Sequence, residues 1–154
     1  WVKHNNLHLT VQFLGSASDE KVTKIRKEVE NIVSSINPFV LTVSETGCFP
    51  NTSKPSVLYL GVGGNIEALK ALVVKINDKM SQIGFKKDSE SFIPHITVAK
   101  INYPQKFNPD LSIFLNSTYD EVEFSVDKIQ LLESKTLTEG VVYETLNTFS
   151  FLEK

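Results

Sequence analysis

The stretch His8-Leu9-Thr10-Val11-Gln12-Phe13 has a counterpart later in the chain, which reads His95-Ile96-Thr97-Val98-Ala99-Lys100. Each segment places histidine two positions before threonine, with bulky apolar residues at the alternate positions. Because successive side chains of a strand point to opposite faces, each histidine shares a face with its threonine. The pattern therefore predicts two strands, facing one another, that each present an imidazole beside a hydroxyl.

Each motif is followed or preceded by a segment with the period of an amphipathic helix. One helix is expected to begin after Ser16 or Ser18 and to end at Asn37-Pro38, and another to span Ile66 to Ile83, before Gly84. Strands are expected at 7–14, 39–44, 56–62, 95–100, 119–126, 128–133 and 141–152, with a turn at 47–51. This order resembles a weak internal duplication of strand, helix and strand, and it predicts a single α+β domain.

Composition restricts the classes of partner. A chain of 154 residues and 17.3 kDa suits one domain, and its net charge of -2 argues against a broad duplex-binding surface. A small anionic ligand or the end of a nucleic-acid strand remains allowed. Cys48 is the only cysteine, which favours a reducing compartment, and we expect a cytoplasmic protein. We find no zinc-ligand spacing and no apolar run of membrane-spanning length, so we predict no metal and no membrane association.

The repeated motif supplies two histidines, which together could act as an acid and a base, as neither copy could alone. A lone histidine in a strand is usually a surface group or a satisfied polar group, and a lone threonine usually reflects β-propensity. Cleavage of a phosphodiester requires one group to remove a proton and another to supply one, and imidazole does either near neutral pH. We therefore predict that His8 and His95 are an acid–base pair, whose two roles remain unassigned. Thr10 and Thr97 are predicted to donate hydrogen bonds to the phosphate oxygens.

These residues resemble the signatures of a known family. His8-Leu9-Thr10-Val11 with Phe13-Leu14-Gly15, and Pro94-His95-Ile96-Thr97-Val98, resemble the two motifs of the two-histidine phosphoesterases. The most similar branch is the bacterial and archaeal RNA 2′,3′-cyclic phosphodiesterases, once called 2′-5′ RNA ligases. The likeness extends over nearly the whole chain, through Trp1-Val2, Gly47-Cys48-Phe49-Pro50, Ser134, Leu137-Thr138, Gly140, Tyr143-Glu144, Leu146 and Phe149.

The resemblance implies an α+β fold of two pseudo-symmetric lobes of antiparallel sheet with flanking helices, and an active cleft between them. Residues 1–154 would form one such domain, without the strand and helix that usually precede the Trp-Val segment in this family. The implied reaction is metal-independent hydrolysis of RNA or nucleotide 2′,3′-cyclic phosphate ends to 2′-phosphate, with a weak reverse 2′-5′ ligase activity. No cofactor and no obligate protein partner are implied; the partners are RNA 3′ ends or small nucleotides.

Three further residues are assigned weaker roles. Lys100 stands where many relatives carry arginine, and its charge suits a phosphate, but strict alternation directs it away from His95. Lys100 therefore serves the site only if the strand bends or ends there; a solvated lysine is the competing interpretation. Phe49 and Tyr59 are predicted to stack on a base at the cleft edge, although core packing is the commoner role of such aromatics.

Two other functions stay open. One is a binding module of the same fold that recognises nucleotides or RNA ends without turnover. The other is a phosphodiesterase for a different small cyclic phosphate.

Overall fold

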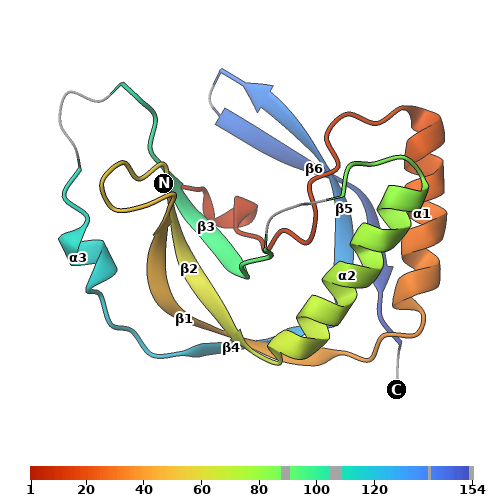
Figure 1. The fold of residues 1–154 in the computed structure, drawn as a ribbon, viewed down its shortest axis with the longest axis horizontal. Helices are drawn as coiled ribbons and strands as arrows, with labels where there is room; N and C mark the ends of the chain where they lie inside the picture. Colours follow the sequence, from red (N-terminus) through yellow and green to blue (C-terminus); the bar gives the residue numbers. More distant parts are fainter. Residues whose placement is uncertain (88–90, 105–108, 139, 153–154) are drawn as a thin grey trace. The chain divides into compact units, whose positions relative to one another are not determined.

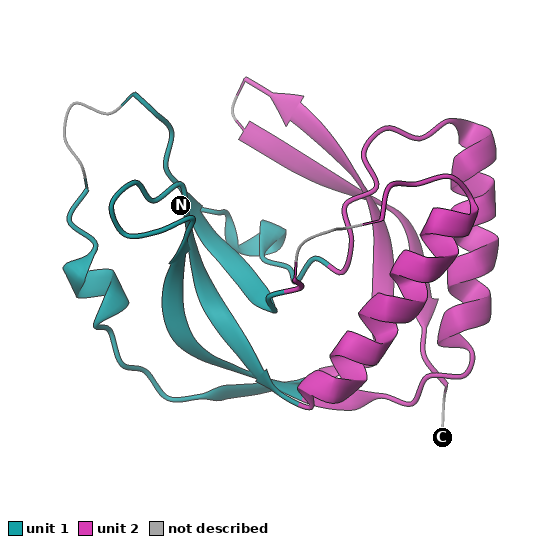
Figure 2. Ribbon diagram, in the orientation of Figure 1, with its two compact units in different colours: residues 1–10, 41–64, 93–124 teal, residues 11–40, 65–92, 125–154 magenta. Residues whose placement is uncertain are grey.

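A computed structural model describes residues 1–87, 91–104, 109–138 and 140–152. It divides into two compact units, one made of residues 1–10, 41–64 and 93–124 and the other of 11–40, 65–92 and 125–154 (Figure 2). In chain order the elements are a 3₁₀ turn η1 (His4–Asn6), α1 (Asp19–Val33), β1 (Phe39–Phe49), β2 (Val57–Gly64), α2 (Ile66–Gln82), β3 (His95–Lys100), α3 (Ser112–Leu115), β4 (Val122–Val126), β5 (Lys128–Leu137) and β6 (Gly140–Ser150) (Figure 1).

Both predicted helices are confirmed, and local side chains explain where they start. The Ser18 hydroxyl accepts a hydrogen bond from the Lys21 amide at 3.4 Å and caps α1. The Asn65 side chain accepts one from the Ala68 amide at 3.2 Å and caps α2. Gly84 follows α2 with a φ of +91°, the left-handed conformation expected at a helix end. α1 ends at Val33, before the predicted end at Asn37-Pro38.

The core of the second unit lies where α1 and α2 pack side by side (Figure 1). Their apolar stripes recur every three or four residues and face each other, which removes them from water. β6 also packs on α1, and the rings of Phe39 and Phe151 stack at 6.1 Å between centroids. The buried members of this core are Ile25, Val29, Ile32, Val33, Phe39, Leu69, Leu72, Val73, Ile76, Met80, Phe85, Phe149 and Phe151.

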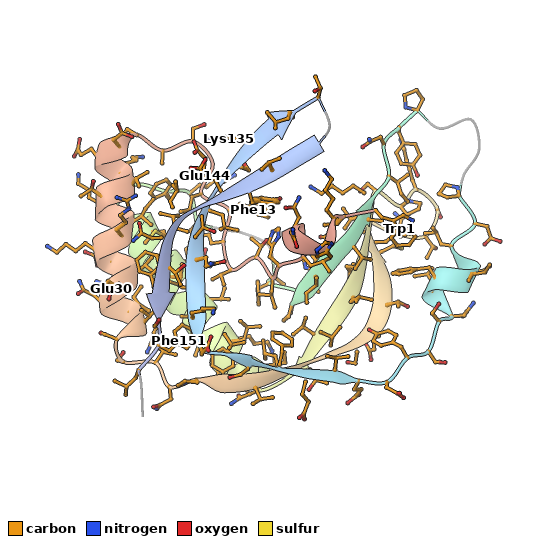
Figure 3. The ribbon with its side chains drawn as sticks, turned by 180° about the vertical axis from the view of Figure 1, so that it is seen from behind. Trp1, Phe13, Glu30, Lys135, Glu144 and Phe151 are labelled. Atoms are coloured by element: carbon orange, nitrogen blue, oxygen red, sulfur yellow. The ribbon has the colours of Figure 1, made fainter. Side chains whose placement is uncertain are left out.

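The strands confirm the predicted α+β class with antiparallel sheets. A four-stranded sheet has the order β3-β2-β1-β4, and β5 and β6 form a separate two-stranded sheet. The pairs β1–β2, β2–β3 and β5–β6 are antiparallel. Across the β5–β6 hairpin, Lys135 and Glu144 form an ion pair of 2.5 Å (Figure 3). This exposed pair lowers the pKa of Glu144 and raises that of Lys135.

The strand predicted at 7–14 is wrong. Of these residues, all described, only Leu9 forms a β-bridge, to Ile96. The Val2 amide donates to the Val98 carbonyl at 2.8 Å, so two short contacts, separated by the η1 turn, share the edge of β3. Beyond Thr10 the chain enters the other unit, and Phe13, expected on an apolar face, is 74% exposed (Figure 3). The turn predicted at 47–51 is also misplaced, since β1 continues through Phe49.

Within the described ranges, no helix has the length and apolar character needed to cross a membrane.

Replacement of Leu72 by alanine should destabilise the protein strongly, because this side chain is 1% exposed between the helices. We expect the free energy of unfolding to fall by about 2–5 kcal/mol, the usual cost of a cavity left by leucine. Val74→Ala, on the exposed face of the same helix at 57% exposure, is the control and should change it by less than about 0.5 kcal/mol. Urea unfolding of both variants measures the difference; equal losses would contradict this account of the core.

Candidate active site

One β-bridge brings the two predicted motifs together. Leu9 pairs antiparallel with Ile96, and side chains directly opposite each other share a face. If the antiparallel register of this bridge continued for one residue on each side, His8 would lie opposite Thr97 and Thr10 opposite His95, all on the other face. In that register the two histidines would be diagonal neighbours, which in a regular antiparallel pair lie about 7–8 Å apart. All four residues belong to the first unit, although His8 and Thr10 come from the start of the chain and His95 and Thr97 from much later.

Both imidazoles are oriented by the same kind of local hydrogen bond, from Nδ1 to a backbone carbonyl. His8 Nδ1 lies 2.6 Å from the carbonyl oxygen of Asn6, and His95 Nδ1 lies 2.7 Å from that of Ile93. A carbonyl oxygen only accepts, so each hydrogen bond requires the proton to be on Nδ1. In the neutral ring this leaves the Nε2 lone pair as the basic position. In both motifs the anchor is the backbone two residues earlier, which makes the two rings chemically equivalent in this respect.

A β-bulge brings Lys100 to the face that carries His95. The pairs between β2 and β3 are Gly61 with His95, Leu60 with Ile96, Tyr59 with Thr97, Leu58 with Ala99 and Val57 with Lys100. Val98 has no opposite residue, and this extra residue resets the alternation of side chains. Lys100 therefore shares a face with Val57, and hence with Tyr59 and Thr97. The burial of Ala99 beside Leu58, both under 9% exposed, agrees with this reset. The bend required for Lys100 to reach the site is therefore present.

Phe49 and Tyr59 also lie on this face, in contact with His95. Their rings stack on each other at 4.4 Å between centroids and 24° between planes. The His95 ring lies edge-on to both, with its centroid 5.1 Å from that of Phe49 and 5.4 Å from that of Tyr59. All three side chains are half-buried. The structure thus brings together every predicted site residue in one unit; whether Phe49 and Tyr59 also stack on a base stays a prediction.

A second irregularity lies in β1 next to the same face. The register of β1 and β2 shifts at Glu45, the one described non-glycine residue with positive φ, at 63°. The Tyr119 hydroxyl donates to the Glu45 carbonyl at 2.7 Å. Burial, followed by the carboxylates of Glu45 and Glu121, raises the pKa of Tyr119, so its hydroxyl stays protonated as a donor. A β-carbon on Gly61, the residue opposite His95, would lie 2.9 Å from the Ser44 carbonyl oxygen.

Several of these features were not found from the sequence. The Asn6 and Ile93 carbonyls carry no signal in residue type, because any residue supplies a backbone oxygen. The residue types around Val98 likewise give no sign of the bulge, because the segment reads as an ordinary apolar strand. Gly47 and Gly61 did offer a signal, since a glycine inside a strand often marks a close approach of other atoms.

The arrangement defines a class of site. The face of β3 carries the imidazole of His95, the hydroxyl of Thr97 and the ammonium group of Lys100, and the first motif is bridged to this strand at Leu9. Groups of these types suit proton transfer at an anionic group such as phosphate. Among the described residues, no group of three or more histidine, cysteine, aspartate or glutamate side chains is placed to bind a metal ion. The site residues named above are acid–base groups and hydrogen-bond donors that suit an anion.

Comparison with known proteins agrees with this class. A sequence model described as the 2′-5′ RNA ligase superfamily matches residues 1–137, and the chain belongs to this superfamily. A relative from Thermotoga maritima named RNA 2′,3′-cyclic phosphodiesterase is 30% identical over 152 residues, covering 98% of this chain and 79% of the relative. One of the same name from Aquifex aeolicus is 31% identical over 156 residues, with coverages of 97% and 80%. The crystal structure of TT0787 of Thermus thermophilus shares the fold, with a TM-score of 0.79, 24% identity and coverages of 97% and 80%.

Gly61→Ala should disturb the strand beneath His95, because the added β-carbon meets a backbone oxygen at 2.9 Å that has no rotamer to change. We expect the free energy of unfolding to fall by about 1–3 kcal/mol, as in other overpacked positions. Gly63→Ala on the same strand is the matched control, because its β-carbon has no neighbour closer than 3.8 Å. Denaturant midpoints of the two variants give the comparison; a Gly61→Ala protein as stable as Gly63→Ala would contradict the contact.

Proposed function

We propose that this protein hydrolyses 2′,3′-cyclic phosphate ends of RNA or small nucleotides to 2′-phosphates, without a metal ion, by acid–base catalysis between His8 and His95. The observation that carries the proposal is the antiparallel bridge between Leu9 and Ile96, which joins the residues directly after His8 and His95. The activity named for relatives at about 30% identity supports the choice of substrate. In this proposal each histidine serves one of the two proton transfers.

The proposed reaction is balanced by two proton transfers. The Nε2 atom of one neutral imidazole accepts a proton from water as the water oxygen forms a bond to phosphorus. The bond between phosphorus and O3′ breaks, and the second imidazole, which starts protonated, delivers its proton to O3′. The product is a 2′-phosphomonoester with a free 3′-hydroxyl. Proton exchange with solvent then restores the starting protonation of both rings. The same anchor on each ring leaves open which histidine is the base.

Charge on the non-bridging oxygens rises in the transition state, and three groups are proposed to stabilise it. In this proposal the hydroxyls of Thr10 and Thr97 act as hydrogen-bond donors. Donors aimed at developing charge stabilise the transition state more than the ground state. Lys100 adds a positive charge from the same face, as a point charge and without the two-pronged geometry of arginine.

A ligase activity would use the same groups. A 5′-hydroxyl of RNA that attacks the cyclic phosphate in place of water would form a 2′-5′ bond, with the same two proton transfers. A weak ligase activity is therefore part of the proposal, with RNA 3′ ends or nucleotides as partners. The cytoplasmic location expected from the single cysteine also stays a prediction.

His8→Ala and His95→Ala should each lower kcat by about 10²–10⁴-fold on an oligonucleotide ending in a 2′,3′-cyclic phosphate, because each removes one proton-transfer group. The double variant should lose little more than the worse single variant, since the two groups act in one step. Product identification by chromatography, with chelator present, is the measurement.

The third histidine provides the control for this test. His4 lies in the η1 turn and is exposed, so His4→Ala should keep the wild-type rate. Turnover that depends on an added divalent metal, or a 3′-phosphate product, would overturn the mechanism. Tight binding of the oligonucleotide without turnover would favour the binding module, and turnover confined to a non-nucleotide cyclic phosphate would favour the other phosphodiesterase.

Thr97→Val removes a hydroxyl at nearly constant shape and should lower kcat by about 10²-fold, the lower end of the range for one oxyanion donor. Thr97→Ser keeps the hydroxyl and should lose much less. Steady-state kinetics on the same substrate, at a pH near neutrality, compare the two. If valine and serine give equal rates, the hydroxyl does not contact the reacting phosphate.

A further inference from the structure

The three rings of His95, Phe49 and Tyr59 form one compact cluster. Their centroids are separated by 4.4, 5.1 and 5.4 Å, so the His95 ring is nearly equally far from the two aromatic rings. If the imidazole were a third layer on the outer face of the stack, its centroid would lie much farther from one aromatic ring than from the other. His95 therefore lies beside the stack, against both rings at once, with its plane turned by 77° from Phe49 and by 61° from Tyr59.

The backbone of β1 is adapted to this cluster. Gly47 lies opposite Tyr59 in the β1–β2 register. A β-carbon on Gly47 would overlap Cζ and the hydroxyl oxygen of Tyr59, at a separation that real atoms do not adopt. The Tyr59 ring thus occupies the space that any side chain at position 47 would fill. Phe49, two residues further along β1, stacks on a face of the same ring.

We propose that Phe49 and Tyr59 are positioning residues for His95: the stacked pair, seated over Gly47, limits the rotation of the imidazole and so sets the direction of its Nε2 atom. This inference rests on the proposed function for its catalytic consequence, and on the ring geometry alone for the contact itself. The hydrogen bond from Nδ1 to the Ile93 carbonyl fixes one point of the ring. Two aromatic neighbours at steep angles to the imidazole supply the second constraint.

The consequence for the reaction is a matter of geometry. Proton transfer requires the nitrogen and oxygen atoms to approach within hydrogen-bond distance in a narrow range of angles. An imidazole that is free to turn about its Cβ–Cγ bond spends part of its time pointing elsewhere. A misplacement of about 1 Å lowers a rate by as much as 10²-fold, which sets the scale of the expected effect.

This role differs from that of a base-stacking platform. In the structure the two rings stack on one another and turn toward His95, so they already make the contacts through which the proposal works. If the rings were a base-stacking platform, their loss would mainly raise KM, and only for a substrate that has a base. If the rings position His95, their loss would lower kcat for every substrate.

The experiment compares Tyr59→Leu with Tyr59→Phe, and Phe49→Leu with Phe49→Tyr, so that each loss of a ring has a partner that keeps it. Two substrates are used, adenosine 2′,3′-cyclic phosphate and 1-O-methylribose 2′,3′-cyclic phosphate, which has no base. Proton–nitrogen correlation spectra follow the ring signals of His95, assigned from the His95→Ala protein. Thermal melting of each variant establishes that it is folded.

We expect both leucine variants to lower kcat by roughly 10- to 100-fold on both substrates, with KM within about 2-fold of wild type. The His95 ring signals should move in the leucine variants, and the phenylalanine and tyrosine variants should recover most of the rate. Losses in KM restricted to the adenosine substrate would overturn the proposal in favour of base stacking. Unchanged His95 signals in a folded Tyr59→Leu protein would overturn it as well.

The His95 ring spectra test the positioning contact independently of whether the protein has the proposed activity. If the wild-type protein turns over neither of these substrates nor the oligonucleotide ending in a 2′,3′-cyclic phosphate, the proposed function fails, and the His95 signals still decide whether the pair constrains the ring. Should Tyr59→Leu fail to fold, Phe49→Leu applies the same test from the other side of the cluster.

Discussion

The pairing of Leu9 with Ile96 is the contact on which the proposed chemistry depends. It joins a short segment near the start of the chain, which contains His8 and Thr10, to β3 by a single β-bridge. One bridge contributes little free energy, since the net value of a hydrogen bond is about 1 kcal/mol. The segment is supported by a second contact, from the Val2 amide to Val98, on the far side of the η1 turn. The two short contacts together hold the first motif on the sheet.

The face that receives this segment is shaped by departures from regular sheet geometry. An extra residue at Val98 returns Lys100 to the side of His95, and a shift at Glu45 alters the neighbouring strand. Gly47 and Gly61 remove side chains where a ring and a carbonyl come close. Each departure costs packing or backbone entropy, and departures of this kind gather next to functional sites because they direct side chains there. The second unit places two helices over an apolar core, and its β5–β6 pair carries one register shift, between Leu131 and Leu132.

The predictions from sequence succeeded where a pattern is local. α1 and α2 were found because their apolar residues recur with the helical period and because Ser18, Asn65 and Gly84 mark their ends. The first motif was assigned to a strand on the same kind of evidence and is not one, since a strand requires a partner along its length. Alternation also placed Lys100 on the wrong face, because a bulge depends on the register between two strands and leaves no trace in either sequence alone.

The sequence by itself determined the residue types of the site, the family to which the chain belongs and the class of fold. Two His-x-Thr segments are recognisable wherever they stand, because side-chain chemistry is a property of each residue. Only the tertiary structure decided that Leu9 pairs with Ile96, that a bulge puts Lys100 on the face of His95, and that Phe49 and Tyr59 turn their rings toward that imidazole. These are relations between segments distant in the chain, and they arise from strand register and from the space that glycines leave.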